Sequence, residues 1–344
     1  MEKIDFNAGE EKRFFEFISK LNGNDKIALI SHSRDIDGII SAKVVNSVID
    51  VELIKFVDYN DLNDELLNEL KQKGITKTIV TDLGAEENFF INLSKLCEVL
   101  IIDHHQFKVD LNTYKIVFLN VQGLCAAYIS YYLFSKVDNL EKLDWLIAIA
   151  SVSDWLYHKN RKFVEMTYKK YGDELKVEGI LVKKEGKFWK LLTEIYNSIL
   201  FFSKDVKNVY NNLGEEFGDI GELGKHAKEV QEEIDKSIQN FWKEKNEING
   251  RDVFVYRPRF PTGSVISSMI SGEIIDKTLI IIEDKEETFH VHGRRQDQKE
   301  NMSVLMKRLI KDLESASGGG HIPAAGAHFM KKDFDTVMKR LKEF

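Results

Sequence analysis

The fold is decided by residues 77–105, which read KTIVTDLGAEENFFINLSKLCEVLIIDHH. Residues 77–84 and 98–105 are apolar runs with the length of a buried strand, and each ends in polar side chains. Between them, residues 87–96 have the length and the pattern of a helix. A strand, a helix and a second strand in this order predict two parallel strands joined by a helical crossover.

The same alternation continues on both sides of this segment. Further strands are predicted at 26–31, 51–58 and 115–120, and helices at 10–21, 39–49, 61–73, 125–137 and 143–155. Gly74 follows the helix at 61–73 and is a natural C-cap. We therefore predict an α/β fold whose N-terminal domain has a mainly parallel sheet with helices on both faces.

The rest of the chain predicts a helical connector and a smaller C-terminal α/β domain. Residues 156–250 are highly charged and mostly helical in pattern, with one long helix at 225–245. The C-terminal domain is expected to hold strands at 251–258, 277–284 and 287–295, helices at 264–275 and 303–316, a glycine-rich loop, and a final helix from 333. We place the domain limits at 1–210, 211–250 and 251–344.

Length and composition narrow the class of protein. The chain has 344 residues, 43% of them hydrophobic, which is too long for one typical core. Its two cysteines, Cys97 and Cys125, form no CxxC pair, so we expect neither disulfides nor a cysteine zinc site, and a cytoplasmic location. No apolar run reaches the roughly 18 residues that cross a bilayer, so we expect no membrane partner.

The charge distribution leaves two interpretations of one segment. A net charge of −7 argues against a general nucleic-acid coating protein, which needs a basic surface. Residues 155–190 nevertheless hold ten Lys and Arg against five Asp and Glu. The aromatic residues among them include Tyr157, Phe163, Tyr168, Phe188 and Trp189. This composition fits a surface that tracks a nucleic-acid strand, or a solvated helical face whose aromatic rings point into the core.

Four clusters of acidic residues and histidines carry the chemistry. They are Asp35 and Asp37 in SHSRDIDG, Asp82 in VTDLG, Asp103-His104-His105 in IIDHH, and Asp154 in SVSDW. One of these clusters directly follows a predicted strand and two others stand at the ends of predicted strands, and the ligand crevice of an open α/β sheet lies outside the carboxyl ends of its strands. The fourth follows an apolar helical run and can fold over the other three.

This arrangement suits phosphodiester hydrolysis. The reaction builds negative charge, and two metal ions about 3.5–4 Å apart can activate water and hold the displaced oxygens. Carboxylates with one or two imidazoles fit manganese or magnesium better than zinc, which prefers more nitrogen and sulfur ligands.

Each cluster also has a structural interpretation. A single Asp after a strand, such as Asp82, is more often a turn former or a helix N-cap than a ligand. Residues 103–105 place three titratable groups after the apolar run VLII, which is costly near a core unless they have partners, although a surface turn could hold them. The four clusters together are far more specific than any one of them.

A second set of candidates lies in the C-terminal domain. The stretch SGGGHIPAAGAH at 317–328 offers glycines whose backbone can approach a phosphate, followed by His321; the alternative is a flexible loop. Arg294 and Arg295 follow a predicted strand and could pair with phosphate, or they could be a solvated strand end. His290 and His292 alternate on that strand, and we interpret them as ordinary strand residues.

These motifs resemble those of a known family. The set SHSRDIDG, VTDLG, IIDHH and SVSDW resembles the four motifs of the DHH phosphoesterase superfamily, and SGGGHIPAAGA resembles the GGGH motif of the DHH-associated C-terminal domain. The resemblance covers roughly residues 26–155 and 251–330, while the segment between them is not diagnostic.

The resemblance implies a manganese-dependent phosphoesterase with two Mn²⁺ ions, for which Mg²⁺ is the alternative. It implies metal ligation by Asp35, Asp37, Asp82, His104 and Asp154. Asp82 would bridge the ions, His105 would contact the scissile phosphate, and Asp103 would hold His104 in the right tautomer. The substrate would be gripped by Arg294, Gly319, Gly320 and His321.

One feature departs from the family pattern. Many members have a histidine four residues before the first Asp of the first motif, whereas His32 stands three residues before Asp35, so its role as a ligand is open. The chain is shorter than the bacterial RecJ exonuclease and looks closer to compact archaeal RecJ-like nucleases and to the nanoRNase branch.

Three functions follow from the resemblance. The first is a RecJ-like exonuclease that hydrolyses single-stranded DNA or RNA to mononucleotides, with replication or repair proteins as further partners. The second is a hydrolase of very short RNA, of 3′-phosphoadenosine-type nucleotides or of cyclic dinucleotides. The third is a non-catalytic Cdc45-like replication scaffold, which is disfavoured because an unneeded cluster of carboxylates repels itself. A homo-oligomer is left open.

Overall fold

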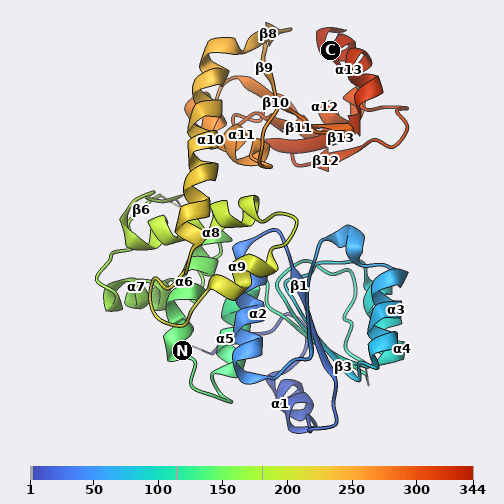
Figure 1. Ribbon diagram of the computed structural model, residues 1–344, viewed down its shortest axis with the longest axis vertical. Helices are drawn as coiled ribbons and strands as arrows, with labels where there is room; N and C mark the ends of the chain where they lie inside the picture. The colour runs from blue at the N-terminus through green and yellow to red at the C-terminus, as the bar shows by residue number, and fades with distance from the viewer. Residues whose placement is uncertain (1–2, 114, 180, 344) are drawn as a thin grey trace. The chain divides into compact units, whose positions relative to one another are not determined.

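The computed structural model describes residues 3–113, 115–179 and 181–343. The chain divides into two compact units, Met1–Ala227 and Lys228–Phe344. Each unit contains a β-sheet of its own (Figure 1).

The first unit is built on a parallel sheet. Its strands are β1 (Ile27–His32), β2 (Leu53–Val57), β3 (Lys77–Thr81), β4 (Glu98–Asp103) and β5 (Ile116–Asn120). In the described part of the chain these five strands pair in the order β2-β1-β3-β4-β5, and every pairing is parallel. The predicted α/β architecture is therefore confirmed, and the carboxyl ends of all these strands lie along one edge.

Helices cover both faces of this sheet. The helices of this unit are α1 (Glu11–Ser19), α2 (Ile36–Val48), η1 (Tyr59–Asp61), α3 (Asp64–Lys73), α4 (Glu87–Leu96), α5 (Ala126–Phe134), η2 (Glu141–Leu143), α6 (Asp144–Ser153), α7 (Arg161–Lys170), α8 (Gly186–Phe201) and α9 (Lys207–Asn212), with a short hairpin of β6 (Val177–Glu178) and β7 (Leu181–Val182). Figure 1 shows α3 and α4 on one face of the sheet and α2 and α5 on the other. Gly74 caps α3 with a φ of 67°, as predicted. Among the described residues, no helix combines the length and the apolar character that crossing a membrane would need.

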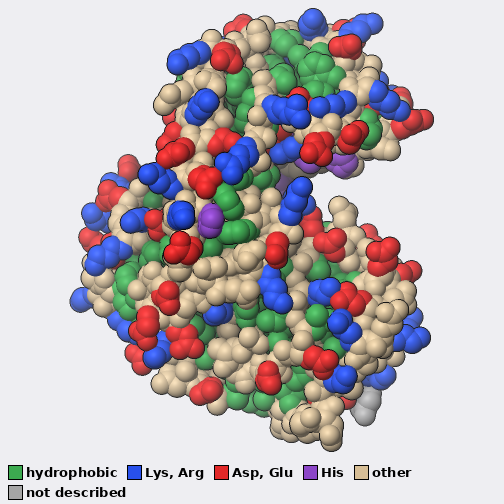
Figure 2. Space-filling view, in the orientation of Figure 1, with side chains coloured by type: hydrophobic (Ala, Val, Ile, Leu, Met, Phe, Trp, Pro, Cys, Tyr) green, Lys and Arg blue, Asp and Glu red, His purple; other side chains and the backbone are tan. Residues whose placement is uncertain are grey.

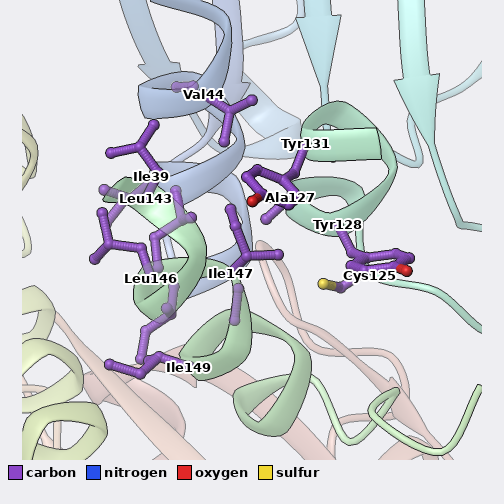
Figure 3. Close-up of a cluster of buried hydrophobic side chains, with 14 of the residues drawn as sticks. Ile39, Val44, Cys125, Ala127, Tyr128, Tyr131, Leu143, Leu146, Ile147 and Ile149 are labelled. Atoms are coloured by element: carbon purple, nitrogen blue, oxygen red, sulfur yellow. The ribbon is translucent and has the colours of Figure 1, made fainter. Parts of the chain in front are cut away.

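The alternation of side chains along each strand divides the core into two layers. On β1, Leu29 packs in the layer formed with α2, α5 and α6, and the next residue, Ile30, packs with α3 and α4. All residues of α5 are buried, which explains why its sequence is apolar on every side. Figure 3 shows this layer, where Val44 of α2, Tyr131 of α5 and Ile147 of α6 belong to one hydrophobic cluster.

The five aromatic residues named above in the basic segment are buried in the core or pack against it, whereas Trp155 of the same segment is 46% exposed. Tyr157, Tyr168 and Phe188 are buried, and Phe163 and Trp189 pack against the same cluster. Their interpretation as rings that stack on a nucleic-acid strand is therefore wrong, and the alternative of a solvated helical face with rings in the core is confirmed. Figure 2 shows acidic and basic side chains interspersed over the visible face, with no continuous basic stripe on it.

The second unit contains a mixed sheet. The long helix α10 (Leu223–Glu244) precedes it and confirms the helix predicted at 225–245. The strands are β8 (Asn246–Ile248), β9 (Arg251–Tyr256), β10 (Thr278–Asp284), β11 (Thr288–Arg294), β12 (Ser317–Gly320) and β13 (Ala324–Met330), in the order β12-β13-β11-β10-β9-β8. The remaining helices are α11 (Gly263–Glu273), α12 (Met302–Leu309), η3 (Lys331–Asp333) and α13 (Phe334–Glu343).

Two predictions for this unit are wrong. The glycine-rich segment is not a loop, because Ser317–Gly320 forms the edge strand β12, paired antiparallel with β13. The side chains of β13 alternate between buried and partly exposed, but its small residues conceal this period from the sequence. The helix predicted to reach residue 316 ends at Leu309, and Asp312 and Ser315 then adopt left-handed backbone angles of 58° and 53°.

The packing of α12 gives a direct test of the second core. Leu305 is 4% exposed and lies in the hydrophobic cluster of the second unit, whereas its neighbour Val304 is 44% exposed. We expect Leu305→Ala to lower the free energy of unfolding by about 2–5 kcal/mol. Val304→Ala is the matched control and should change it by less than about 0.5 kcal/mol. Urea unfolding followed by circular dichroism measures both, and equal losses would contradict this assignment of the helix face.

Candidate metal centre

The predicted site residues of the first unit meet at the carboxyl edge of its sheet. His32 ends β1, Asp82 directly follows β3, Asp103 ends β4, and Asp154 directly follows α6. The described residues form three groups whose ligand atoms lie within 4.8 Å of one another: His32 with Asp35 and Asp82, Asp37 with His104 and Asp154, and Asp82 with His104 and His105. All the residues predicted as metal ligands are therefore brought together.

Asp82 links these groups. It is 2% exposed, and it has a left-handed φ of 56°, which is unusual for a residue other than glycine. Its carboxylate Oδ1 lies 3.2 Å from Nε2 of His104. Because Asp82 belongs to the first group and to the third, it lies between the two halves of the cluster.

Asp35 has a structural role and a place in the cluster. Its Oδ1 accepts a hydrogen bond from the Gly38 amide at 2.9 Å, so Asp35 is the N-cap of α2. Its Oδ2 lies 2.7 Å from Nδ1 of His32. Asp35 thus orients the His32 ring. Although His32 stands three residues before Asp35, and not four, it still lies in the cluster.

Asp37 is tied to a helix far away in the sequence. Its two carboxylate oxygens accept hydrogen bonds from the amides of Ala126 at 2.7 Å and Ala127 at 2.8 Å, the first residues of α5. Free amides and the positive end of the helix dipole favour a carboxylate at this position. No local pattern in the sequence indicated this contact.

Asp103 orients His105, so the expectation that it holds His104 is wrong. Its Oδ1 lies 2.8 Å from Nδ1 of His105 and also accepts the His105 amide at 2.7 Å. Its Oδ2 accepts the Leu83 amide at 2.6 Å, which fixes the turn that carries Asp82. The His104 ring instead faces carboxylates, and its Nε2 lies 3.4 Å from Oδ2 of Asp154.

Ionisation of several carboxylates in the cluster is unfavourable. Burial, followed by repulsion from neighbouring carboxylates, raises the pKa of Asp37 and of Asp82 well above the usual range. The same causes raise the pKa of Asp154 to about 6. Burial, together with the neighbouring His105, lowers the pKa of His104 to about 4, so this imidazole is neutral at pH 7, as a metal ligand has to be.

Asp103 and His105 behave differently from the rest. Burial is the largest single influence and raises the pKa of Asp103, but the hydrogen bonds from the ring and the amide of His105 and the charges of the two imidazoles together outweigh it, and the net pKa is lowered. Burial is the largest single influence and lowers the pKa of His105, but the hydrogen bond to Asp103 and the negative charges of Asp103, Asp37 and Asp154 together outweigh it, and the net pKa is raised. The two side chains therefore form an ion pair inside the cluster.

The donor set fits a hard divalent cation. Within the cluster, three buried side-chain atoms have no hydrogen-bond partner among the described residues: Nε2 of His32, Oδ2 of Asp82 and Oδ2 of Asp154. Buried polar atoms are normally paired, and these three atoms belong to the groups that could hold an ion. A set rich in carboxylates with some imidazole suits Mn²⁺ or Mg²⁺ more than Zn²⁺.

The four residues predicted to bind substrate lie in the second unit. Arg294 ends β11 and is in register with Ala324, whose carbonyl accepts the His321 amide at 2.8 Å. Arg294, Gly320 and His321 therefore lie at the same end of that sheet, and Gly319 is paired with Gly326. The Nε of Arg294 lies 3.4 Å from the Ser267 hydroxyl.

Two further features of this region are an ion pair of Arg295 and a hollow lined by histidines that was not predicted from the sequence. Arg295 forms a two-pronged contact with Asp297, at 2.5 and 2.9 Å, so the interpretation of Arg295 as a strand end is favoured. His290, His292 and His328 line a hollow of about 410 Å³. The only signal in the sequence was the alternation of these histidines with buried residues.

Comparison with known proteins identifies the fold. No protein-family model and no curated protein matches the chain. Among solved structures, exonuclease RecJ bound to manganese has a TM-score of 0.69 and 14% identity over 100% of this chain and 95% of its own. RecJ from Thermus thermophilus with Mn²⁺ has a TM-score of 0.66 and 15% identity over 97% of this chain, which spans 54% of that protein.

A third solved structure extends the comparison to another substrate class. A pGpG-specific phosphodiesterase from Vibrio cholerae has a TM-score of 0.50 and 15% identity, over 92% of this chain and 98% of its own. The chain thus has the fold of a RecJ-like DHH phosphoesterase, and the resemblance inferred from the motifs is confirmed at the level of the fold.

Asp82 provides a test of the cluster that does not depend on activity. Its raised pKa means that its charge destabilises the metal-free protein at pH 7, because the unfolded chain ionises at the usual value near 3.9. We therefore expect Asp82→Asn to raise the Tm of the metal-free protein, by about 2–4 °C for each kcal/mol of repulsion removed. We also expect the variant to lose most of the stabilisation by Mn²⁺.

The control is Asp50→Asn, since Asp50 is an exposed carboxylate outside the cluster. This variant should keep both the Tm of the metal-free protein and its response to Mn²⁺. Differential scanning calorimetry with EDTA and with Mn²⁺ measures both quantities. An Asp82→Asn protein that responds to Mn²⁺ like the wild type would exclude Asp82 as a ligand.

Proposed function

We propose that this chain is a metal-dependent phosphodiesterase that degrades single-stranded DNA or RNA to mononucleotides as an exonuclease. The observation that carries the proposal is the position of Asp82 in two groups of metal-binding geometry, with one of its buried oxygens unpaired. The likeness to exonuclease RecJ bound to manganese supports the nuclease branch of this fold.

The proposed ligands divide between two ions. His32 and Asp35 would hold one ion, and Asp37, His104 and Asp154 would hold the other. Asp82, which groups with His32 and Asp35 and also with His104, would be shared. Bound ions would polarise the phosphate and make water a better nucleophile at neutral pH. RecJ structures are known with Mn²⁺ and with Mg²⁺, and either ion suits this donor set.

The chain supplies the proton chemistry through His105. Asp103 holds Nδ1 of this ring, so Nε2 is the nitrogen left for the substrate. The raised pKa of His105 keeps more of the ring protonated near neutral pH than a free histidine would be. We assign His105 to bind a phosphate oxygen and to donate a proton toward the leaving oxygen. Arg294, Gly319, Gly320 and His321 would bind further phosphate oxygens.

A second candidate function is the hydrolysis of dinucleotides or other small nucleotides. The likeness to the pGpG-specific phosphodiesterase favours it, because this chain spans 98% of that protein. The acidic net charge of −7 favours it as well, since a small substrate needs no long basic surface. A non-catalytic scaffold would leave the unpaired buried ligand atoms unexplained.

The test is a time course with end-labelled single-stranded RNA and DNA, from dinucleotides to ~30-mers, at low salt because phosphate contacts weaken as salt rises. We expect stepwise shortening with Mn²⁺ and none with EDTA. Cleavage that is confined to the shortest substrates would contradict the exonuclease and support the second candidate function, the hydrolysis of small nucleotides. No cleavage of any substrate with Mn²⁺ or Mg²⁺ would contradict the proposed function.

The ion pair between Asp103 and His105 predicts a pH effect. Asp103 raises the pKa of His105, so the protonated ring persists to higher pH than it otherwise would. Asp103→Asn should therefore move the basic limb of the kcat profile to lower pH and reduce kcat by about 10- to 100-fold. Rates measured from pH 5 to 9 with Mn²⁺ test this. A uniform loss of activity with an unchanged profile would exclude the role assigned to His105.

A further inference from the structure

A hollow of about 570 Å³ lies beside the candidate metal centre, within the first unit. Its lining comes from η1, from the start of α3 and from the start of α4, and includes Tyr59, Asn60, Asn63, Gly84, Asn88 and Phe89. Neither the motifs nor the proposed roles account for this hollow, which we call the side pocket.

Two of the lining residues contact the cluster directly. The ring of Tyr59 lies 5.3 Å from the ring of His32, measured between centroids. Gly84 lies against His105 so closely that a Cβ at this position would stand 2.6 Å from Cγ of the imidazole. Residues on both sides of the side pocket therefore contact the candidate metal centre, and a molecule bound at the cluster could extend into the pocket.

The chemistry of the side pocket suits an uncharged group. Its lining contains no lysine, arginine or histidine, and it contains the carboxylates of Asp64 and Glu86. A phosphate would be repelled there, whereas carboxylates and amides pair well with the edges of nucleobases. Asn60 and Asn88 are exposed and line the side pocket, so their side-chain amides are accessible to a ligand there.

Tyr59 offers a held aromatic surface. Its side chain is 45% exposed, although it belongs to a short helix that is firmly capped. The carboxylate of Asp58 accepts a hydrogen bond from the Tyr59 amide at 2.9 Å, and the carboxylate of Asp61 accepts one from the Asp58 amide at 2.8 Å. Arg34 forms an ion pair with Asp58. A ring held in this way can stack on a base at little further cost in conformational entropy.

We propose that the side pocket binds the base and the sugar of a nucleotide whose phosphate lies at the metal centre, with Tyr59 stacked on the base. This inference rests on the proposed function and narrows its substrates to phosphodiesters that carry a nucleoside beside the scissile bond. A volume of about 570 Å³ is within the ~300–1,000 Å³ of pockets that enclose small ligands, and it can hold one nucleoside.

The first experiment compares a dinucleotide with the two analogues that lack one base each, in the wild type, Tyr59→Ala and Tyr59→Phe. In the wild type, removal of one particular base should raise KM by roughly 5- to 150-fold, the range of base stacking on aromatic rings. Tyr59→Ala should raise KM for the intact dinucleotide by a similar factor and should lose sensitivity to that base. Tyr59→Phe keeps the ring and should resemble the wild type.

Two outcomes would overturn the proposal. In one, Tyr59→Ala impairs the intact dinucleotide and both analogues by the same factor, which is the pattern of a general structural defect. In the other, Tyr59→Ala resembles the wild type on every substrate. Either result would leave the phosphodiesterase itself standing.

A binding measurement separates this proposal from the proposed function. Calorimetry with Mn²⁺ compares adenosine 5′-monophosphate and guanosine 5′-monophosphate with inorganic phosphate, and it requires no turnover. We expect Tyr59→Ala to weaken binding of at least one mononucleotide by roughly 5-fold or more, and to affect phosphate far less. Equal affinity of the wild type and Tyr59→Ala for both mononucleotides would overturn the side pocket as a base site, whether or not the protein cleaves any phosphodiester.

Discussion

The repulsion between buried carboxylates is the constraint on which the first unit depends. Asp35, Asp37, Asp82 and Asp154 are held within one small volume, and burial and mutual repulsion oppose the ionisation of three of them. The parallel sheet makes the arrangement possible, because it brings the carboxyl ends of separate strands to one edge. Helix N-termini then offset part of the repulsion, since Asp35 caps α2 and Asp37 binds the free amides of α5.

The order of residues in the motif at 103–105 has a physical reason. Asp103 is fully buried, and its hydrogen bonds go to the turn after Asp82 and to the ring and amide of His105. One carboxylate thus fixes the strained backbone of Asp82 and the orientation of a neighbouring imidazole. His104, between them in the sequence, is left to face the other carboxylates. A substitution at Asp103 therefore disturbs two strands at once.

The sequence predicted the strands of the first unit and the meeting of its four motifs, because hydrophobic period and strand ends are local properties. It could not predict that Asp37 contacts α5, since this contact joins residues 89 positions apart. It missed β12, because the three glycines of this strand carry little β-propensity. It assigned Asp103 to the wrong histidine, because both rings lie within two positions of Asp103 and only the turn geometry distinguishes them.

The acidity of the chain is compatible with a nucleic-acid substrate if the phosphate and the uncharged part of a nucleotide are bound at separate sites. If metal ions at the cluster neutralise the scissile phosphate, the chain needs few lysines and arginines around it. The side pocket then needs no positive charge, because the part of a nucleotide that it would hold is neutral. The net charge of −7 also limits binding along a nucleic-acid backbone, so recognition has to come from the nucleotides nearest the reacting bond. This separation of charged and neutral binding sites favours an enzyme that acts at the end of a nucleic-acid strand or on a very short oligonucleotide. It disfavours a protein that coats nucleic acid along its length.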